Sequence, residues 1–125
     1  MVQRVNYDTL PEAVGPYVHA TKHNETLYLS GLTALGTQAQ AGGFQEQCAE
    51  VLAQIEGVLK QEKRSKGDIV KVTIFLKDIA QLSAVREQLF AFYDTHLPAC
   101  SLVEISSLIH PDLLLEMEAI IALQA

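Results

Sequence analysis

The last quarter of the chain contains two apolar runs, residues 98–105 and 113–121, in which side-chain character alternates with a period of two. Such alternation is typical of β-strands, because successive side chains point to opposite faces of a sheet. One face of the second run holds Leu115, Met117, Ala119, Ile121 and Leu123, and the other holds Leu114, Glu116, Glu118 and Ile120. Two carboxylates among large aliphatic residues are not typical of a face that simply contacts water, so we expect another structure to cover it.

A β-hairpin is predicted near the N-terminus, with strands at residues 17–22 and 25–30 around a turn at residues 23–24. Its two faces carry Leu27 and Leu29 on one side, and Tyr28 and Ser30 on the other. An irregular lead-in at residues 10–16 precedes it, because two prolines and a glycine there disfavour both helix and central strand. His19 in the first strand is expected to be hydrogen-bonded or solvated, without a second ligand at metal spacing.

Two amphipathic helices follow. The first begins at Phe44 and presents one apolar stripe, made of Phe44, Cys48, Val51, Leu52, Ile55, Val58 and Leu59. Its basic C-terminal end is compatible with the helix dipole, and we expect Gly67 to terminate it. The second spans residues 79–96 and ends before Pro98. Its expected buried residues are Leu82, Val85, Leu89 and Phe92, with Phe90 or Tyr93 alongside.

Between the helices, residues 68–77 form the clearest strand of the chain. One face is expected to hold Val70, Val72, Ile74 and Leu76, and the other Lys71, Thr73 and Phe75. The predicted order is therefore β-β-α-β-α-β-β. With right-handed crossovers, this order predicts one sheet with both helices on one face, a two-layer α+β sandwich.

The sheet face away from the helices is expected to be unusually apolar for a monomer. It would collect Tyr17, His19, Tyr28, Ser30, Thr73, Phe75, Cys100, Leu102, Glu104, Leu114, Glu116 and Glu118. So much aromatic and aliphatic area predicts a homo-oligomer, whose interface can leave clefts for a small ligand. The glycine-punctuated loop at residues 36–43 is a candidate lid or rim, and it lacks the Gly-Lys-Ser/Thr ending of a phosphate loop.

Composition narrows the function classes. A chain of 125 residues predicts a single domain, residues 1–125, and a formal charge of −6 disfavours nucleic-acid binding through a broad cationic face. The N-terminus lacks the apolar core of a secretory signal, and no stretch approaches membrane-spanning length, so we expect a cytoplasmic protein. Cys48 and Cys100 lie in unrelated contexts, which predicts neither a metal pair nor a disulfide framework.

Landmarks along nearly the whole chain resemble those of the RidA family, also called YjgF/YER057c/UK114. They are Gly15-Pro16-Tyr17, Ser30-Gly31, the segment 67–78, the segment 98–105 and the segment 116–120. The resemblance implies a chorismate-mutase-like fold and a homotrimer whose sheets form a central barrel, with three clefts between subunits. In the best-known branch, these clefts hydrolyse enamines and imines such as 2-aminoacrylate to 2-keto acids and ammonia, without a cofactor.

The resemblance also implies site residues. Tyr17, Ser30 and Gly31 would shape the cleft and hydrogen-bond the ligand, and Glu116 would position or activate the hydrolytic water. The deaminase branch has an arginine within Pro-Ala-Arg-Ser that grips the substrate carboxylate, and here that position is Cys100. Leu102 replaces a cysteine that is common in the same branch. The sequence therefore resembles a branch that lacks the arginine, in which deamination does not follow from Glu116 alone.

Several alternatives remain open at this stage. Arg86 occupies a position where the deaminase branch commonly has a cleft asparagine, so its guanidinium can replace the missing one, or it can be a surface arginine. Cys100 can be a small hydrophobe or a nucleophile. Glu116 and Glu118 can act as paired carboxylates or bridge to a basic residue of a neighbouring subunit.

Three function classes fit the sequence. One is an enamine/imine deaminase, and the second is a non-catalytic protein that binds a small metabolite or regulates a partner. The third is a ribonuclease or translation inhibitor, which the acidic balance and the lack of an RNA-binding motif disfavour.

Overall fold

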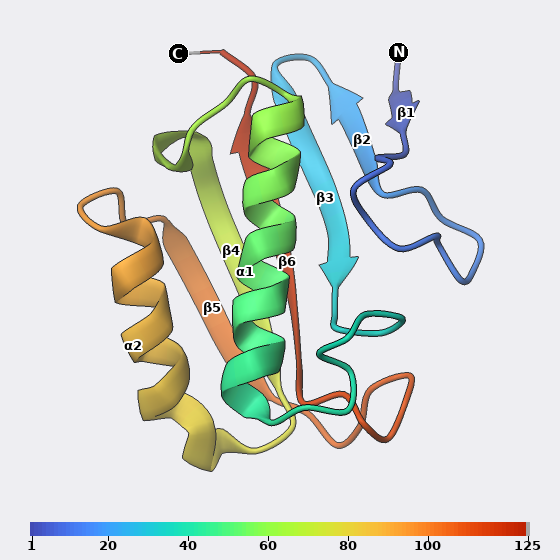
Figure 1. The fold of residues 1–125 in the computed structure, drawn as a ribbon. Helices are drawn as coiled ribbons and strands as arrows, with labels where there is room; N and C mark the ends of the chain where they lie inside the picture. The colour runs from blue at the N-terminus through green and yellow to red at the C-terminus, as the bar shows by residue number, and fades with distance from the viewer. Residues whose placement is uncertain (125) are drawn as a thin grey trace.

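The strands of the chain pair into one sheet in a computed structural model that describes residues 1–124 (Figure 1). Within these residues the sheet has six strands in the order β1-β2-β3-β6-β4-β5. Their bounds are β1 Gln3–Val5, β2 Ala20–His23, β3 Thr26–Leu32, β4 Ile69–Leu76, β5 Ala99–Glu104 and β6 Leu115–Ala122. Only the β4–β5 pair is parallel, and α2 crosses between these two strands. The other neighbouring strands are antiparallel.

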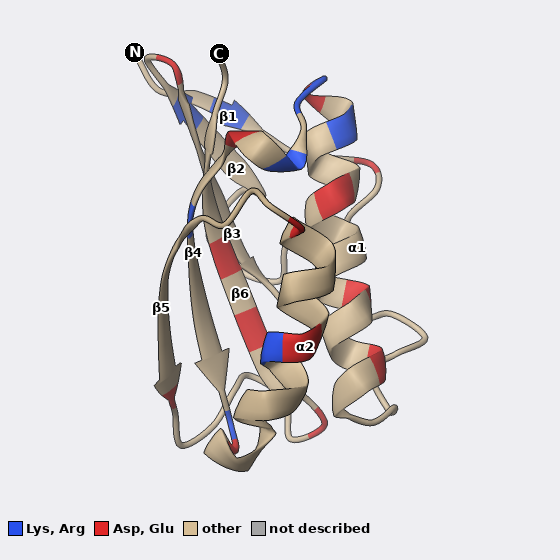
Figure 2. Cartoon of the chain, turned by 90° about the vertical axis from the view of Figure 1, so that its left-hand side faces the viewer, with Lys and Arg blue, Asp and Glu red and all other residues tan. Residues whose placement is uncertain are grey.

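Both helices pack on the same face of the sheet, as the side view in Figure 2 shows. They are α1 Phe44–Gln61 and α2 Leu82–Tyr93, and short 3-10 turns, η1 Lys66–Asp68 and η2 Ile79–Gln81, precede β4 and α2. The predicted two-layer α+β sandwich is therefore confirmed. All seven residues of the predicted α1 stripe are buried, because their three-and-four spacing keeps them on one side of the helix. No helix in residues 1–124 is long and apolar enough to cross a membrane.

The last strand, β6, lies in the centre of the sheet between β3 and β4. Its residues Leu115, Met117, Ala119 and Ile121 are at most 3 % exposed and contact the helix layer, whereas Glu118 on the other face is exposed. The predicted alternation of β6 is thus confirmed. The central position also places Glu116 in the middle of the uncovered face, away from both sheet edges.

The predicted hairpin begins later than the sequence suggested, at Ala20 rather than Tyr17. Pro16 lies in a bend closed by the Tyr17 amide, which donates to the Gly15 carbonyl (2.9 Å). Backbone hydrogen bonding to β3 therefore begins at His19, whose carbonyl accepts from the Ser30 amide (2.9 Å), and the paired residues begin at Ala20. β1 was not predicted, because three residues are too few to give a periodic pattern.

Two further expectations were wrong. Val70 is 51 % exposed, because a register shift between Ile69 and Lys71 puts Ile69 on the core face instead. Gly67 does not terminate α1, which ends at Gln61, and Lys63 takes the positive φ of 57° in the turn that follows. In α2, Tyr93 is buried and Phe90 is 62 % exposed, which settles the alternative left open by the sequence.

The predicted placement of β5 was also wrong. Cys100 lies beside Val72, and Leu102 beside Ile74, and paired residues share a face of a sheet. Because Val72 and Ile74 are buried under the helices, Cys100, Leu102 and Glu104 belong to the helix face and not to the uncovered one. Consistently, a Glu104 carboxylate oxygen accepts a hydrogen bond from the Ile79 amide (2.9 Å), at the start of η2.

Candidate functional site

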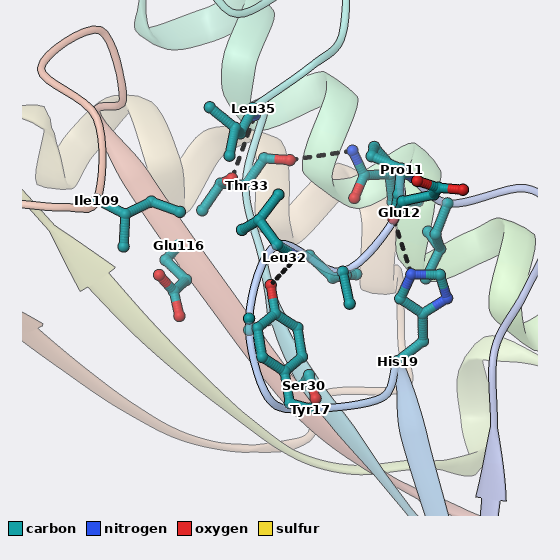
Figure 3. Close-up of a pocket in the computed structure, with 16 residues that line it drawn as sticks. Pro11, Glu12, Tyr17, His19, Ser30, Leu32, Thr33, Leu35, Ile109 and Glu116 are labelled. Atoms are coloured by element: carbon teal, nitrogen blue, oxygen red, sulfur yellow. Dashed lines mark hydrogen bonds between the residues drawn. The ribbon is translucent and has the colours of Figure 1, made fainter.

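A pocket of about 500 Å³ opens between the lead-in segment, the end of β3 and the beginning of β6. Figure 3 shows its lining, with Glu116 beside Ile109 and Tyr17 across from them. Four residues that the sequence singled out line this pocket together: Tyr17, Ser30, Gly31 and Glu116. They come from the lead-in, β3 and β6, segments that lie far apart in the sequence.

Gly31 and Glu116 are in direct contact across the β3–β6 pair. A Cβ atom added at Gly31 would overlap the carboxylate of Glu116, so glycine is what leaves room for this side chain. The contact falls in the register shift of β3 between Leu29 and Leu32. Such irregularities redirect side chains locally, and here the result is a carboxylate held against a bare backbone.

Burial raises the pKa of Glu116, and the negative charge of Glu118 raises it further. The two residues share the uncovered face at a spacing of two. Among residues 1–124, neither of them forms an ion pair within the chain. A carboxyl group with a raised pKa exchanges protons closer to neutral pH, which suits it to general acid and base chemistry.

The neighbouring polar groups are held in place by backbone contacts. The Ser30 hydroxyl donates to the Val18 carbonyl (2.7 Å), which leaves its oxygen free to accept a hydrogen bond from a ligand. The Tyr17 ring is 47 % exposed at the pocket mouth, and its hydroxyl accepts a long hydrogen bond from the Val14 amide (3.4 Å). Both groups are therefore available at the surface of the cavity.

His19 fixes the lead-in segment that forms one wall of the pocket. The Tyr7 amide donates to its Nδ1 (2.8 Å), and its Nε2 lies 2.7 Å from the Pro11 carbonyl. Because Nδ1 accepts, Nε2 must donate, so the ring is the neutral Nε2–H tautomer. His19 is 7 % exposed and stacks on the Tyr7 ring, and the Tyr7 hydroxyl in turn donates to Glu62, the residue directly after α1 (2.7 Å). The prediction of a hydrogen-bonded His19 is confirmed.

The other three candidates lie apart from this pocket. Cys100 and Leu102 are on the helix face of the edge strand β5, and Arg86 is an exposed residue of α2. Burial raises the pKa of the Cys100 thiol, an effect that Lys71 partly opposes, so the sulfur is predominantly protonated at neutral pH. Within one chain, the candidates thus form two groups on different faces of the sheet.

Several residues that line the pocket were not predicted from the sequence. Leu10, Pro11, Val14 and Ile109 come from irregular segments, where no periodicity marks them. Gln54 did carry a signal, because it is a polar residue within the apolar face of α1. It is 6 % exposed, and its amide donates to the Thr33 carbonyl at the pocket wall (3.0 Å).

The loop at residues 36–43 does not line this pocket, so the expectation of a rim there was wrong for this cavity. Of the connection between β3 and α1, Thr33 and Leu35 line the pocket, and residues 36–43 do not. The loop is instead fastened to the core by the fully buried Gln47. Its Nε2 contacts the carbonyls of Gln40, Gly42 and Asp112, and its Oε1 accepts from the Leu114 amide (2.9 Å).

Residues 1–124 contain no group of three or more His, Cys, Asp or Glu side chains placed to hold a metal ion. The polar side chains that line the pocket are those of Glu12, Tyr17, His19, Ser30, Thr33, Gln54 and Glu116, together with backbone polar groups.

Known proteins share both the sequence pattern and the fold. A family model described as endoribonuclease L-PSP matches residues 8–123. The RutC family protein PYRAB12510 of Pyrococcus abyssi is 32 % identical over 113 residues, 88 % of each chain. The 2-iminobutanoate/2-iminopropanoate deaminase of Salmonella typhimurium is 30 % identical over 125 residues, 96 % of this chain and 97 % of that one. The crystal structure of YyfA from Yersinia pestis, a protein of unknown function in the conserved Rid family, superimposes with a TM-score of 0.89 at 31 % identity, over 98 % of this chain and 99 % of that one.

Proposed function

The chain belongs to the RidA family, the family of the endoribonuclease L-PSP model, and from that premise we propose that its pocket hydrolyses a C=N bond of a small enamine or imine. The observation that carries the proposal is the Glu116 carboxyl group. It is half-buried, has a raised pKa, and sits against Gly31 in a pocket with Ser30 and Tyr17. The Salmonella typhimurium relative is named as a deaminase of 2-imino acids, which is chemistry of this kind.

In the proposed reaction, water attacks the imine carbon and Glu116 transfers the protons. The carboxylate accepts a proton from the attacking water as the C–O bond forms, and the C=N electron pair moves to nitrogen. From a protonated imine this gives a neutral carbinolamine. The carboxyl group returns its proton to nitrogen, and the C–N bond then breaks: ammonia leaves, the hydroxyl proton passes to the carboxylate, and the C=O bond of the product forms. Ser30 and the backbone at Gly31 orient the substrate next to this group.

A second copy of the chain is expected to complete the cleft. Within residues 1–124 no helix covers the sheet face that carries Glu116, and this face exposes Tyr28 by 46 % and Val103 by 45 %. The second candidate group, around Cys100, lies at the opposite sheet edge and cannot reach the pocket of its own chain. We propose that a neighbouring subunit supplies it, in a homotrimer with three such clefts.

One observation favours a second function, that of a non-catalytic binding protein. Cys100 stands where the resemblance expects the arginine that grips a substrate carboxylate. Without that clamp, the cleft loses affinity and orientation for 2-imino acids. A cleft that retains its shape while lacking the clamp can bind a metabolite without turning it over.

Hydrolysis of 2-aminoacrylate and 2-aminocrotonate, generated in situ by a pyridoxal-phosphate dehydratase, separates these functions. Acceleration of ammonia release by the wild type, abolished in Glu116→Gln, supports the hydrolase. A matched control is Glu25→Gln, which removes an exposed carboxylate at the β2–β3 turn. If the wild type does not accelerate hydrolysis but Cys100→Arg does, then the other cleft residues can still catalyse the reaction. The natural ligand of the wild type is in that case not one of these two imines.

A further inference from the structure

The charged side chains that line the pocket are all acidic. Glu12 and Glu116 line it, and Glu118 lies next to Glu116 on the same face. Among the described residues 1–124, no lysine or arginine lines this pocket or the adjoining cavity formed by Phe75, Ile105, Ser107, Leu108 and Ile109 with Glu116.

The basic residues of the chain are concentrated elsewhere. Figure 2 shows most of them at the end of the molecule where α1 terminates, whereas Glu116 and Glu118 are the second and fourth residues of β6, which starts at the opposite end (Figure 1). Lys71 is on the same sheet face, but it pairs with Ile120, four residues along β6 from Glu116. At about 3.4 Å per residue, that separation is about 13 Å.

The rest of the wall is apolar. Leu10, Val14, Leu32, Leu35 and Ile109 surround the cavity, whose volume of about 500 Å³ exceeds what a three-carbon imino acid fills. A carboxylate placed here would lose its hydration and meet like charge from Glu116. One cation borders the site: Arg4 lines a neighbouring cavity that shares Gly15, Tyr17 and Ser30 with this one, and its guanidinium donates to the Val2 carbonyl (3.4 Å). A protonated imine, in contrast, would meet a carboxylate of opposite charge.

We propose that this cleft selects imines that carry a lipophilic side chain and no carboxylate on the C=N carbon. The inference rests on the proposed hydrolytic function of the same site. The reaction is R–CH=NH + H₂O → R–CHO + NH₃: a C–O bond forms, the C–N bond breaks, and the protons of water pass to the leaving nitrogen, with no change in oxidation state. The replacement of the clamp arginine by Cys100 then fits the substrate, because no carboxylate remains to be held.

A matched pair of imines tests the selection. A flavin amine oxidase acting on 2-phenylethylamine gives an imine without a carboxylate, and an amino acid oxidase acting on phenylalanine gives the imino acid with the same side chain. Competition between hydrolysis and semicarbazide trapping measures the rate for each. We expect kcat/KM at least 10-fold higher for the carboxylate-free imine, and a shift of at least 10-fold toward the imino acid in Cys100→Arg. Equal rates, or preference of the wild type for the imino acid, overturn the inference.

Arg86→Ala examines the guanidinium that the sequence offered as a replacement for the missing arginine. If Arg86 holds a carboxylate from a neighbouring subunit, the variant loses imino acid hydrolysis selectively, and that result overturns the inference. We expect the variant to retain the wild-type preference. Arg86 is exposed on α2 and lies outside the pocket of its own chain, so we expect the variant to fold like the wild type.

A binding measurement distinguishes failure of this inference from failure of the proposed function. If the protein accelerates hydrolysis of neither imine over the uncatalysed reaction, the proposed hydrolytic function is excluded. Calorimetry with two stable probes then still tests the charge preference of the cleft. We expect the cation 2-phenylethylammonium to bind at least 10-fold tighter than the anion 3-phenylpropanoate. Tighter binding of the anion, or no binding of the amine, overturns the inference.

Discussion

The backbone of Gly31 touches the carboxylate of Glu116, and a single methyl group at Gly31 would occupy the space of that carboxylate. The two residues lie on adjacent strands, β3 and β6, at the point where their register shifts. A general acid or base acts only when its carboxyl group is held in place, so this contact links a backbone irregularity to the chemistry of the cleft.

Gly31→Ala should lower activity without unfolding the protein. The new methyl group meets the end of a flexible side chain and not backbone, and Gly31 does not have a positive φ, so we expect a loss of stability below about 1 kcal/mol. Displacement of the carboxyl group by about 1 Å should reduce kcat/KM by about 100-fold. Gly43→Ala is the control, because a Cβ there meets nothing within 4 Å. Unchanged activity in Gly31→Ala would contradict the assigned role of the contact.

Glu116→Gln should stabilise the protein at neutral pH. The folded pKa of Glu116 is raised above its usual 4.5, so the folded chain favours the neutral carboxyl group, and the ionised group destabilises the fold. That destabilisation is complete above the folded pKa, fades as pH falls through it, and is absent below 4.5. Melting temperatures of both proteins should therefore differ at pH 7 and converge in acid. A variant that melts below the wild type at pH 7 would show that the carboxylate has a stabilising partner.

Gln47→Leu should be strongly destabilising. The substitution is nearly isosteric, but it leaves three carbonyls and the Leu114 amide without the partner that Gln47 provides at a fully buried position. Buried polar groups without partners make a loss of about 2–4 kcal/mol the expected result in urea unfolding. Gln45→Leu, an exposed position on the same helix, should change stability by less than about 0.5 kcal/mol.

His19→Leu should weaken ligand binding as well as stability. The variant loses the hydrogen bonds that hold Tyr7 and Pro11, so the lead-in wall of the pocket is released, at about 1–3 kcal/mol of unfolding free energy. Calorimetry with 2-phenylethylammonium should show at least 10-fold weaker binding. His23→Leu, at the exposed end of β2, is the control. Equal affinity in the two variants would mean that the lead-in segment does not shape the cleft.

Val103→Lys should disrupt the proposed assembly. Val103 is exposed on the uncovered face beside Phe75, and a charge buried there without a partner opposes association. Light scattering should report a smaller species than for the wild type. Phe90→Lys, an exposed apolar position on α2, should leave the mass unchanged. If Val103→Lys has the wild-type mass, the uncovered face is not the interface.

The strongly periodic elements were predicted well, and the irregular ones were not. The α1 stripe and the alternation of β6 follow directly from spacing, because burial against one layer imposes the same period on sequence and structure. The faces of β4 and β5 were mistaken where local pairing decides the result. A bulge in β4 places Ile69 instead of Val70 on the core face. The parallel register with β4 places Cys100 and Leu102 on the face that the helices cover.

The sequence by itself determined the fold class and the family, since each depends on residue type and order along the chain, and it predicted Glu116 as the leading site residue. Only the tertiary structure decided which candidates meet. Tyr17, Ser30, Gly31 and Glu116 converge because β6 inserts between β3 and β4, and Cys100 is excluded because register, not spacing, selects a strand's face. The acidic, apolar character of the pocket was likewise decided in three dimensions, because its walls come from irregular segments that no periodic pattern brings together.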